Sequence, residues 1–133
     1  MTISHVLDTC AVLDLAAGRW RHGRARKALA SAENPVVLAV SVWEIARKLR
    51  VGKLSLPCAQ DGVLGFVEEV CRHHALSLLS LDAGVCAAAE LLPPYHEDPF
   101  DRMIIAAAMS AGAPVFTIDP RFADYGATVL VYR

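Results

Sequence analysis

The sequence predicts an α/β fold, a three-layer α/β/α sandwich whose central sheet is mainly parallel. Two observations carry this prediction. Short runs of apolar residues that favour strands alternate with longer amphipathic patterns, which is typical of repeated βαβ units. In addition, 133 residues, of which 55% are hydrophobic and 20% charged, suffice to bury a real core in one domain spanning residues 1–133.

Five short apolar runs are the expected strands. Residues that form turns or begin helices bound them, such as Asp8 after the first run and Pro35 before the second. The third run follows an amphipathic helical pattern, and the fourth follows a helix that a glycine ends. The expected strands are residues 3–7, 36–40, 76–81, 115–118 and 128–132.

Helical patterns lie between these runs, and several of them carry recognisable end signals. Ser41 is a natural N-cap, and Asp82 is expected to cap an alanine-rich helix that two prolines end. Pro99 suits the first position of the next helix, and Gly112 ends that helix. The expected helices are residues 10–17, a basic helix ending near 32, a helix from 41 to 51, then 59–73, 83–92 and 99–111, with a tight segment at 119–125.

Composition and charge exclude several classes of protein. No apolar run approaches the ~20 residues that a membrane helix needs, so we expect no contact with a membrane. The start of the chain lacks the pattern of a signal peptide, which favours a cytoplasmic protein. The formal net charge of −1 argues against holding nucleic acid by a basic surface alone, but leaves open binding through metal ions. The four cysteines lack the spacing of a zinc or disulfide framework.

Four acidic residues stand where expected strands end or helices begin: Asp8, Glu44, Asp98 and Asp119. Asp8 and Asp119 directly follow apolar runs, and ligands of open parallel sheets lie outside the carboxyl ends of the strands. Joined by two carboxylates from helices, they would form an oxygen-rich cluster. Such a cluster suits a hard divalent cation, Mg²⁺ or Mn²⁺, and indicates metal-assisted hydrolysis of a phosphodiester.

Each of these carboxylates also has a purely structural interpretation. Asp8 and Asp98 can be helix N-caps, where the helix dipole stabilises an anion, and Asp119 before a proline favours a turn. Glu44 can pair with Lys48, four residues further along the same helix. These alternatives stay open for each residue taken alone. The set of carboxylates, repeated at strand ends and helix starts, is what favours a site.

Four segments of the chain, taken in order, form a recognisable set. They are Leu7-Asp8-Thr9; Ser41-Val42-Trp43-Glu44-Ile45 with Lys48 and Gly52-Lys53-Leu54; the block from His96 to Ala106; and Thr117-Ile118-Asp119. With them the chain resembles the PIN domain family, and more closely its VapC-type toxins, the ribonuclease halves of bacterial toxin–antitoxin pairs. The run Asp98-Pro99-Phe100-Asp101-Arg102 is the most specific part of the likeness.

The resemblance implies a site and a reaction. Thr9 and Thr117 match hydroxyl positions that accompany the acidic site on the substrate side. Many relatives carry Arg or Lys where this chain has Glu97, which adds negative charge beside the site. The implied reaction is hydrolysis of RNA by a water that Mg²⁺ or Mn²⁺ activates. The implied catalytic acids and metal ligands are Asp8, Glu44, Asp98 and Asp119, with Asp101 as a further metal ligand.

Basic side chains near the predicted acidic site are candidates to hold substrate phosphates. For each of them taken alone, a solvated helix face is the simpler interpretation. His96, in the loop before Asp98, is expected to order that loop. The candidates for phosphate binding are Arg47, Lys48, Arg50, Arg102 and Arg121.

The resemblance also implies protein partners. These are a second copy of the chain, in a homodimer, and a cognate VapB-type antitoxin whose extended tail covers the acidic cleft. Apolar residues could supply a patch for such a partner, although packing in the core is the alternative for them. These residues are Trp20, Val42, Trp43, Leu49, Val51 and Leu54.

Three other functions compete with a metal-dependent ribonuclease. A phosphatase of the haloacid-dehalogenase type also begins with an aspartate after a strand, but it needs a second one two positions later, where this chain has Cys10. A catalytically weak PIN-like module that binds RNA or protein would be favoured by loss of an acidic residue, and none is lost. Carboxylates that serve only as caps would make stability independent of metal.

Overall fold

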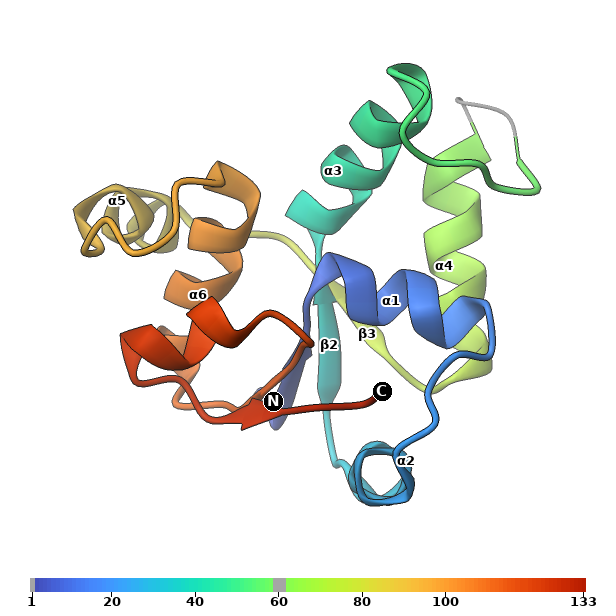
Figure 1. Cartoon of the computed structure of the whole chain (residues 1–133), viewed down its shortest axis with the longest axis horizontal. Coiled ribbons are helices and arrows are strands. Elements are labelled where there is room, and N and C mark those ends of the chain that lie inside the picture. The colour runs from blue at the N-terminus through green and yellow to red at the C-terminus, as the bar shows by residue number, and fades with distance from the viewer. Residues whose placement is uncertain (1, 59–61) are drawn as a thin grey trace.

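The computed structural model describes residues 2–58 and 62–133, in which a five-stranded sheet lies between helices (Figure 1). The strand order is β3-β2-β1-β4-β5, and every neighbouring pair is parallel. This confirms the predicted α/β/α architecture. The strands are β1 (His5–Leu7), β2 (Pro35–Leu38), β3 (Ser77–Leu79), β4 (Val115–Phe116) and β5 (Val129–Leu130).

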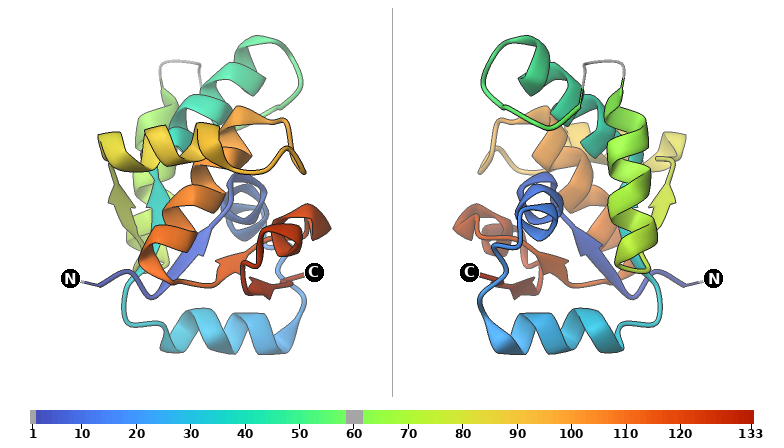
Figure 2. Two further views of the ribbon diagram at one scale, coloured as in Figure 1. Left: turned by 90° about the vertical axis from the view of Figure 1, so that its left-hand side faces the viewer. Right: turned by 90° about the vertical axis from the view of Figure 1, so that its right-hand side faces the viewer.

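Helices cover both faces of this sheet. Figure 2 shows α5 and α6 on one side and α1 and α4 on the other. Within the described residues, none of the helices is long and apolar enough to span a bilayer. The helices are α1 (Thr9–Ala16), α2 (Gly23–Ser31), α3 (Ala39–Arg50), α4 (Val63–His73), α5 (Ala83–Leu91), α6 (Pro99–Ala111) and the 3₁₀ helix η2 (Pro120–Tyr125).

The strand side chains alternate between two apolar cores. Val6 and Val36 belong to the core beneath α5 and α6, whereas Leu7 and Val37 belong to the core beneath α1 and α4. This alternation follows from the two-residue period of a strand and leaves both faces of the sheet apolar, as a buried parallel sheet requires. Trp20 is part of the second core, which corrects its assignment to an apolar surface patch.

The observed strands are shorter than the apolar runs that predict them. β4 keeps only Val115 and Phe116 of the expected 115–118, because its partner β1 ends opposite Phe116, at Leu7. The next residue along β1, Asp8, already caps α1. The residues after Phe116 therefore leave the sheet at the same end as Asp8.

The N-cap of helix α3 lies three residues before the predicted one, Ser41. Ser41 is not an N-cap, because its hydroxyl lies 2.9 Å from the Thr9 hydroxyl in the interior, while Leu38 occupies the cap position. Glu44 is one of the buried residues of this helix. For α4, the predicted residues 59–61 lie outside the described part of the chain, and the helix is observed from Val63.

Other end signals are confirmed. Asp82 accepts a hydrogen bond from the Val85 amide at 2.7 Å and caps α5. Pro99 stands at the start of α6, and Gly112 ends this helix in the left-handed conformation, at a φ of +63°, where a residue with a Cβ would be strained. These signals fix where α6 begins, and therefore where its first-turn carboxylates lie.

Candidate active site

Asp8 lies at the carboxyl end of β1, the central strand of the sheet. One carboxylate oxygen accepts the Ala11 amide at 2.8 Å, which caps α1, and the other accepts the Thr117 hydroxyl. Burial raises the pKa of Asp8 to about 6 despite these hydrogen bonds, and repulsion from Glu44 and Asp119 adds to the rise. Asp8 is therefore a helix cap and also a member of a group of mutually repelling carboxylates.

Glu44 enters the same group from α3. Its Oε2 lies 2.9 Å from the Lys48 ammonium, the pairing that the four-residue spacing predicts. Its Oε1 is buried and, within the described residues, has no hydrogen-bond partner. An unpaired carboxylate oxygen in the interior is costly, and such an atom indicates a water or an ion that belongs there.

Asp98 and Asp101 come from the first turn of α6. Asp98 Oδ1 accepts the amides of Phe100 at 2.8 Å and Asp101 at 3.3 Å, so Asp98 is the N-cap of this helix. Burial, together with the negative charges of Asp98 and Glu44, raises the pKa of Asp101 to about 8. The carboxylates from α6 and α3 are therefore close enough to repel one another.

Asp119 follows β4 and begins η2. Its Oδ1 accepts the backbone amide of Arg121 at 2.9 Å, and its Oδ2 lies 2.9 Å from the guanidinium of that same residue. Burial by itself raises the pKa of Asp119, but the hydrogen bonds from Arg121 outweigh it and leave the pKa below its usual value. The contacts with Arg121 thus favour the ionised form of Asp119.

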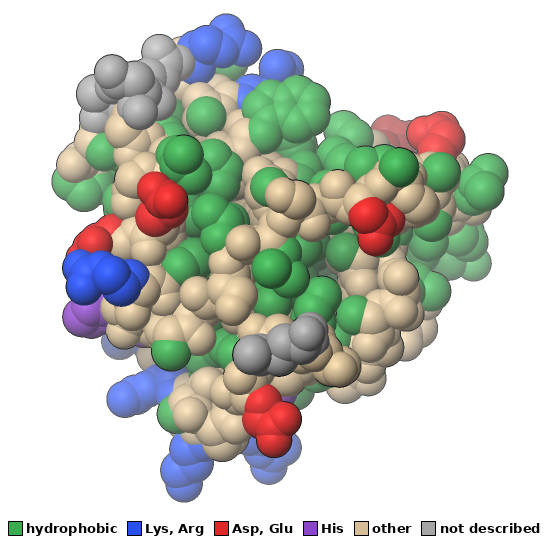
Figure 3. All heavy atoms as spheres, turned by 180° about the vertical axis from the view of Figure 1, so that it is seen from behind, with side chains coloured by type: hydrophobic (Ala, Val, Ile, Leu, Met, Phe, Trp, Pro, Cys, Tyr) green, Lys and Arg blue, Asp and Glu red, His purple; other side chains and the backbone are tan. Residues whose placement is uncertain are grey.

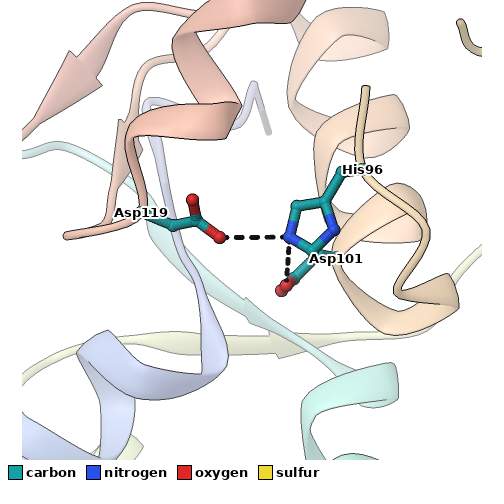
Figure 4. Close-up of side chains that lie close together, drawn as sticks. All are labelled: His96, Asp101 and Asp119. Atoms are coloured by element: carbon teal, nitrogen blue, oxygen red, sulfur yellow. Dashed lines mark hydrogen bonds and ion pairs between the residues drawn. The ribbon is translucent and has the colours of Figure 1, made fainter. Parts of the chain in front are cut away.

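His96 joins Asp101 to Asp119 (Figure 4). Its Nε2 lies 2.9 Å from Asp101 Oδ2 and 3.0 Å from Asp119 Oδ2, and the three ligating atoms lie within 4.8 Å of one another. The Asp98 amide donates to its Nδ1 at 3.3 Å, so a neutral ring carries its proton on Nε2. His96 also orders the loop, because its amide donates to the Tyr125 hydroxyl at 2.9 Å.

The sequence did not identify His96 as a member of the cluster. No second histidine stands at a metal-binding spacing from it, and the sequence around it is that of a loop. One sequence feature does place His96 near the cluster: it stands two residues before an aspartate that caps a helix. An N-cap turns the chain back on itself, and here this turn brings the imidazole over the first turn of α6.

The predicted hydroxyl residues lie inside the protein and support the carboxylates. Thr117 donates to Asp8, and its oxygen accepts the Asp119 amide at 3.0 Å, so it fixes both aspartates at once. The Thr9 hydroxyl is buried against Ser41 and joins the start of α1 to α3. The two threonines are therefore well placed to hold the cluster in shape.

The predicted cationic residues divide into two groups. Lys48 and Arg121 contact carboxylates of the cluster, whereas Arg47 and Arg50 are exposed on α3. Arg102 lies elsewhere: its guanidinium donates to backbone carbonyls of the α5–α6 connection and fastens this loop. These contacts give no support to the expected role of Arg102 in substrate binding. Its carbonyl partners are Glu90, Leu92, Pro93 and His96.

The structure thus brings together five predicted carboxylates and adds an imidazole. Two cations, Lys48 and Arg121, contact this group, so it keeps an excess of negative charge. The carboxylates offer oxygen donors with excess negative charge, and His96 adds one imidazole nitrogen. Such a group is chemically suited to a hard divalent cation. The five carboxylates are Asp8, Glu44, Asp98, Asp101 and Asp119.

Comparison with solved structures shows the same fold. DNA-bound VapBC from Salmonella typhimurium matches with a TM-score of 0.72 at 20% identity, covering 99% of this chain and 100% of that chain. VapBC2 from Rickettsia felis, bound to a fragment of its promoter DNA, gives 0.71 at 11% identity, with 98% and 100% covered. FitAcB from Neisseria gonorrhoeae gives 0.62 at 20% identity, with 96% of each chain covered.

Comparison by sequence identifies the family. No curated protein sequence matches the chain significantly. The sequence profile of the PIN domain matches residues 5–127, nearly the whole chain, and this range includes all five carboxylates of the cluster. The chain therefore belongs to the PIN domain family, whose members are typically nucleases.

Proposed function

We propose that the protein is a metal-dependent endoribonuclease, acting as the toxin of a type II toxin–antitoxin pair, and that residues 1–133 form one nuclease domain. One observation carries the proposal: carboxylates from β1, α3, α6 and the segment after β4 converge at one edge of the sheet, and one buried Glu44 oxygen lacks a partner among the described residues. Membership of the PIN domain family supports the assignment to nucleases.

The donor set fits a hard divalent cation. A buried, unpaired carboxylate oxygen such as Glu44 Oε1 is satisfied by a cation or by a water that a cation holds. When bound, Mg²⁺ or Mn²⁺ supplies charge neutralisation at the phosphate and lowers the pKa of the attacking water. The residues that would hold it are Asp8, Glu44, Asp98, Asp101 and Asp119.

Other residues fix these carboxylates before RNA arrives. Thr117 bridges Asp8 and Asp119, and Arg121 keeps Asp119 ionised. Lys48 pairs with one oxygen of Glu44 and leaves the other free to bind, and its partly exposed ammonium would meet a substrate phosphate at the rim of the site. Charges held in place in this way need little reorganisation during the reaction, which is the main source of electrostatic catalysis.

The partners of the toxin would be a cognate VapB-type antitoxin and a second copy of the chain. The likeness in fold to VapBC and FitAcB supports this part of the proposal. On the side of the chain itself, Val51 is an exposed apolar residue of the kind that protein interfaces use. It lies directly after α3, at the end of the molecule that carries the cluster.

The test is cleavage of a mixed RNA pool by the purified chain in Mg²⁺, in Mn²⁺ and in chelator. Asp8→Asn and Asp98→Asn remove one ligand charge each while keeping a residue that can cap a helix. The matched control is Asp82→Asn, which makes the same change at the N-cap of α5, outside the cluster. We expect metal-dependent cleavage by the wild type and the control, and loss of at least 100-fold in both cluster variants.

Three results would contradict the proposal. Cleavage that persists in chelator, or that survives in Asp8→Asn and Asp98→Asn, would separate the activity from the cluster. A wild-type chain that binds RNA and metal but cuts nothing would favour a PIN-like binding module instead.

A further inference from the structure

The feature that the proposed reaction leaves unused is an exposed tryptophan beside the acidic cluster. Trp43 lies on α3 directly before Glu44, and 60% of its surface is exposed. Its ring meets the ring of Phe100 edge-on, with centroids 4.9 Å apart and planes at 78°. Phe100 lies in the first turn of α6, between Asp98 and Asp101. The aromatic pair therefore connects the two helices that supply three of the five carboxylates.

A cleft of about 250 Å³ begins at Phe100, the partner of Trp43 in this pair. Phe100 lines it together with two carboxylates of the cluster, Glu44 and Asp98. The opposite charge comes from the end of α3 and the residues after it, where Lys48 and two further cations line the same cleft. The view from behind shows basic side chains gathered over the top of the molecule, with hydrophobic side chains directly beside them (Figure 3). The further cations are Arg47 and Lys53.

We propose that Trp43, held by Phe100, is a stacking platform for one unpaired nucleobase next to the scissile phosphate. This inference rests on the proposed ribonuclease function and names a subsite for it. A nucleotide carries a flat, largely apolar base and an anionic phosphate a few ångströms apart. The exposed indole offers a face to the base, and Arg47, Lys48 and Lys53 offer positive charge to the phosphates that flank the scissile one.

A peptide matches this surface less well than a nucleotide does. An acidic segment would meet Glu44 and Asp98 in the cleft, and a basic segment would meet the cations Arg47 and Lys53 at close range. In a nucleotide the charge is confined to the phosphate, which the cations can bind, whereas the base is uncharged and can stack on Trp43. The mixed lining of the cleft therefore favours RNA over either kind of charged peptide.

The platform has a consequence for the kind of RNA that is cut. Within a duplex both faces of a base are covered by its neighbours, and no face is left for an indole. An unpaired base in a loop, bulge or single strand can turn out and stack on an aromatic ring. The inferred subsite therefore selects phosphodiesters that flank an unpaired base.

Trp43 itself provides the measurement. Of the two tryptophans in the chain, Trp20 is buried and Trp43 is exposed, so a base that stacks on Trp43 should quench the exposed component of the fluorescence. The wild-type chain is mixed in Mg²⁺ with a short single-stranded RNA or with the same RNA as a duplex. The signal is read in the first milliseconds, before a turnover at about 10 per second. Cleavage of the same RNA is then followed to obtain kcat and KM.

Two variants and a control complete the experiment. We expect Trp43→Ala to weaken single-strand binding roughly 5- to 150-fold, the range for loss of one stacked base, and to raise KM accordingly. Trp43→Phe should recover part of the affinity. The control is Met109→Ala, which removes a 47% exposed apolar side chain nine residues further along α6 from Phe100 and should change neither quantity.

The possible outcomes separate the subsite from the function. Quenching by single-stranded RNA alone, with loss of affinity in Trp43→Ala, supports the platform even if the chain cuts nothing, in which case only the proposed function fails. Normal cleavage and binding by Trp43→Ala would overturn the platform and leave the function standing. The platform is also overturned if Trp43→Ala keeps its RNA affinity but loses self-association or binding of a protein partner, because Trp43 is then a protein contact.

Discussion

The substitution Asp8→Asn should stabilise the metal-free protein at pH 8. Asp8 is buried among carboxylates, and its pKa is raised from 3.8 to about 6, so keeping it ionised costs about 3 kcal/mol at ~1.4 kcal/mol per pKa unit. Asparagine has the same shape and caps a helix equally well. The amide nitrogen of asparagine cannot accept the hydrogen bond from the Thr117 hydroxyl, and the loss of this bond costs about 1 kcal/mol of stability. A net gain of about 2 kcal/mol remains.

The sign of this effect depends on pH in a defined way. The pKa of Asp8 is higher in the folded than in the unfolded chain, so protonation favours the folded state. Well below pH ~4 the carboxyl is protonated in both states and behaves much like a neutral amide. As the pH rises from about 4 to about 6, the unfolded chain loses this proton and the folded chain keeps it, so the stability of the wild type falls relative to the variant. The advantage of Asp8→Asn should therefore be largest at pH 8 and absent near pH 4.

Urea unfolding in chelator at pH 4 and pH 8 measures this difference directly. Asp82→Asn is the matched control, because it changes an exposed N-cap by the same atoms and should shift the free energy of unfolding by less than ~0.5 kcal/mol at either pH. Equal stability of Asp8→Asn and wild type at pH 8, or the same gain at both values of pH, would refute the reasoning from buried charge.

A divalent cation should reverse the order of stability. Mg²⁺ or Mn²⁺ at about 100 times its dissociation constant stabilises a chain that binds it by about 2.7 kcal/mol. The wild type should gain this amount and Asp8→Asn little of it. The cluster would then be an example of a functional site whose charges lower the stability of the empty protein.

Three further predictions concern the rest of the site and the loop before α6. Mn²⁺ affinity should fall at least 10-fold from pH 8 to pH 6. The pKa values of Asp101 and Asp8 are near 8 and 6, so these carboxyls hold protons that the metal must displace. Calorimetry in two buffers would measure both the affinity and the proton release. Thr117→Val should cost about 1–3 kcal/mol in urea unfolding, since the buried Asp8 oxygen and Asp119 amide both lose a partner. Arg102→Lys should lower the free energy of unfolding by about 2 kcal/mol, because an ammonium cannot reach the several carbonyls that the guanidinium joins. Its Mn²⁺ affinity should change less than threefold. A loss of Mn²⁺ affinity that exceeds the loss of stability would contradict the role of Arg102 in the loop.

Much of the fold could be predicted because its signals are local. The alternation of apolar runs with amphipathic patterns depends on residues close in sequence, as do the caps at Asp82 and Asp98. The lengths of the strands could not be predicted in this way. β4 ends at Phe116 because β1 ends opposite it, and such a limit depends on a partner more than 100 residues away.

The same distinction applies to the site. Carboxylates at strand ends are readable, since the topology of a parallel sheet brings them to one edge. The start of α3 was misplaced because Ser41 has the chemistry of an N-cap, and only the buried contact with Thr9 shows why it lies inside the helix. His96 was expected only to order its loop. Its position between Asp101 and Asp119 depends on how the loop folds over α6, which the place of His96 two residues before Asp98 does not by itself determine.

The central claim is that the carboxylate cluster holds the cation on which RNA cleavage depends, and a calorimetric titration of Mn²⁺ at pH 8 tests it most directly. Wild type, Asp8→Asn and Asp82→Asn are titrated side by side. We predict binding by the wild type and by Asp82→Asn with the same affinity, and at least a 10-fold loss in Asp8→Asn. Equal Mn²⁺ affinity in all three proteins, or no binding by the wild type, would contradict the claim.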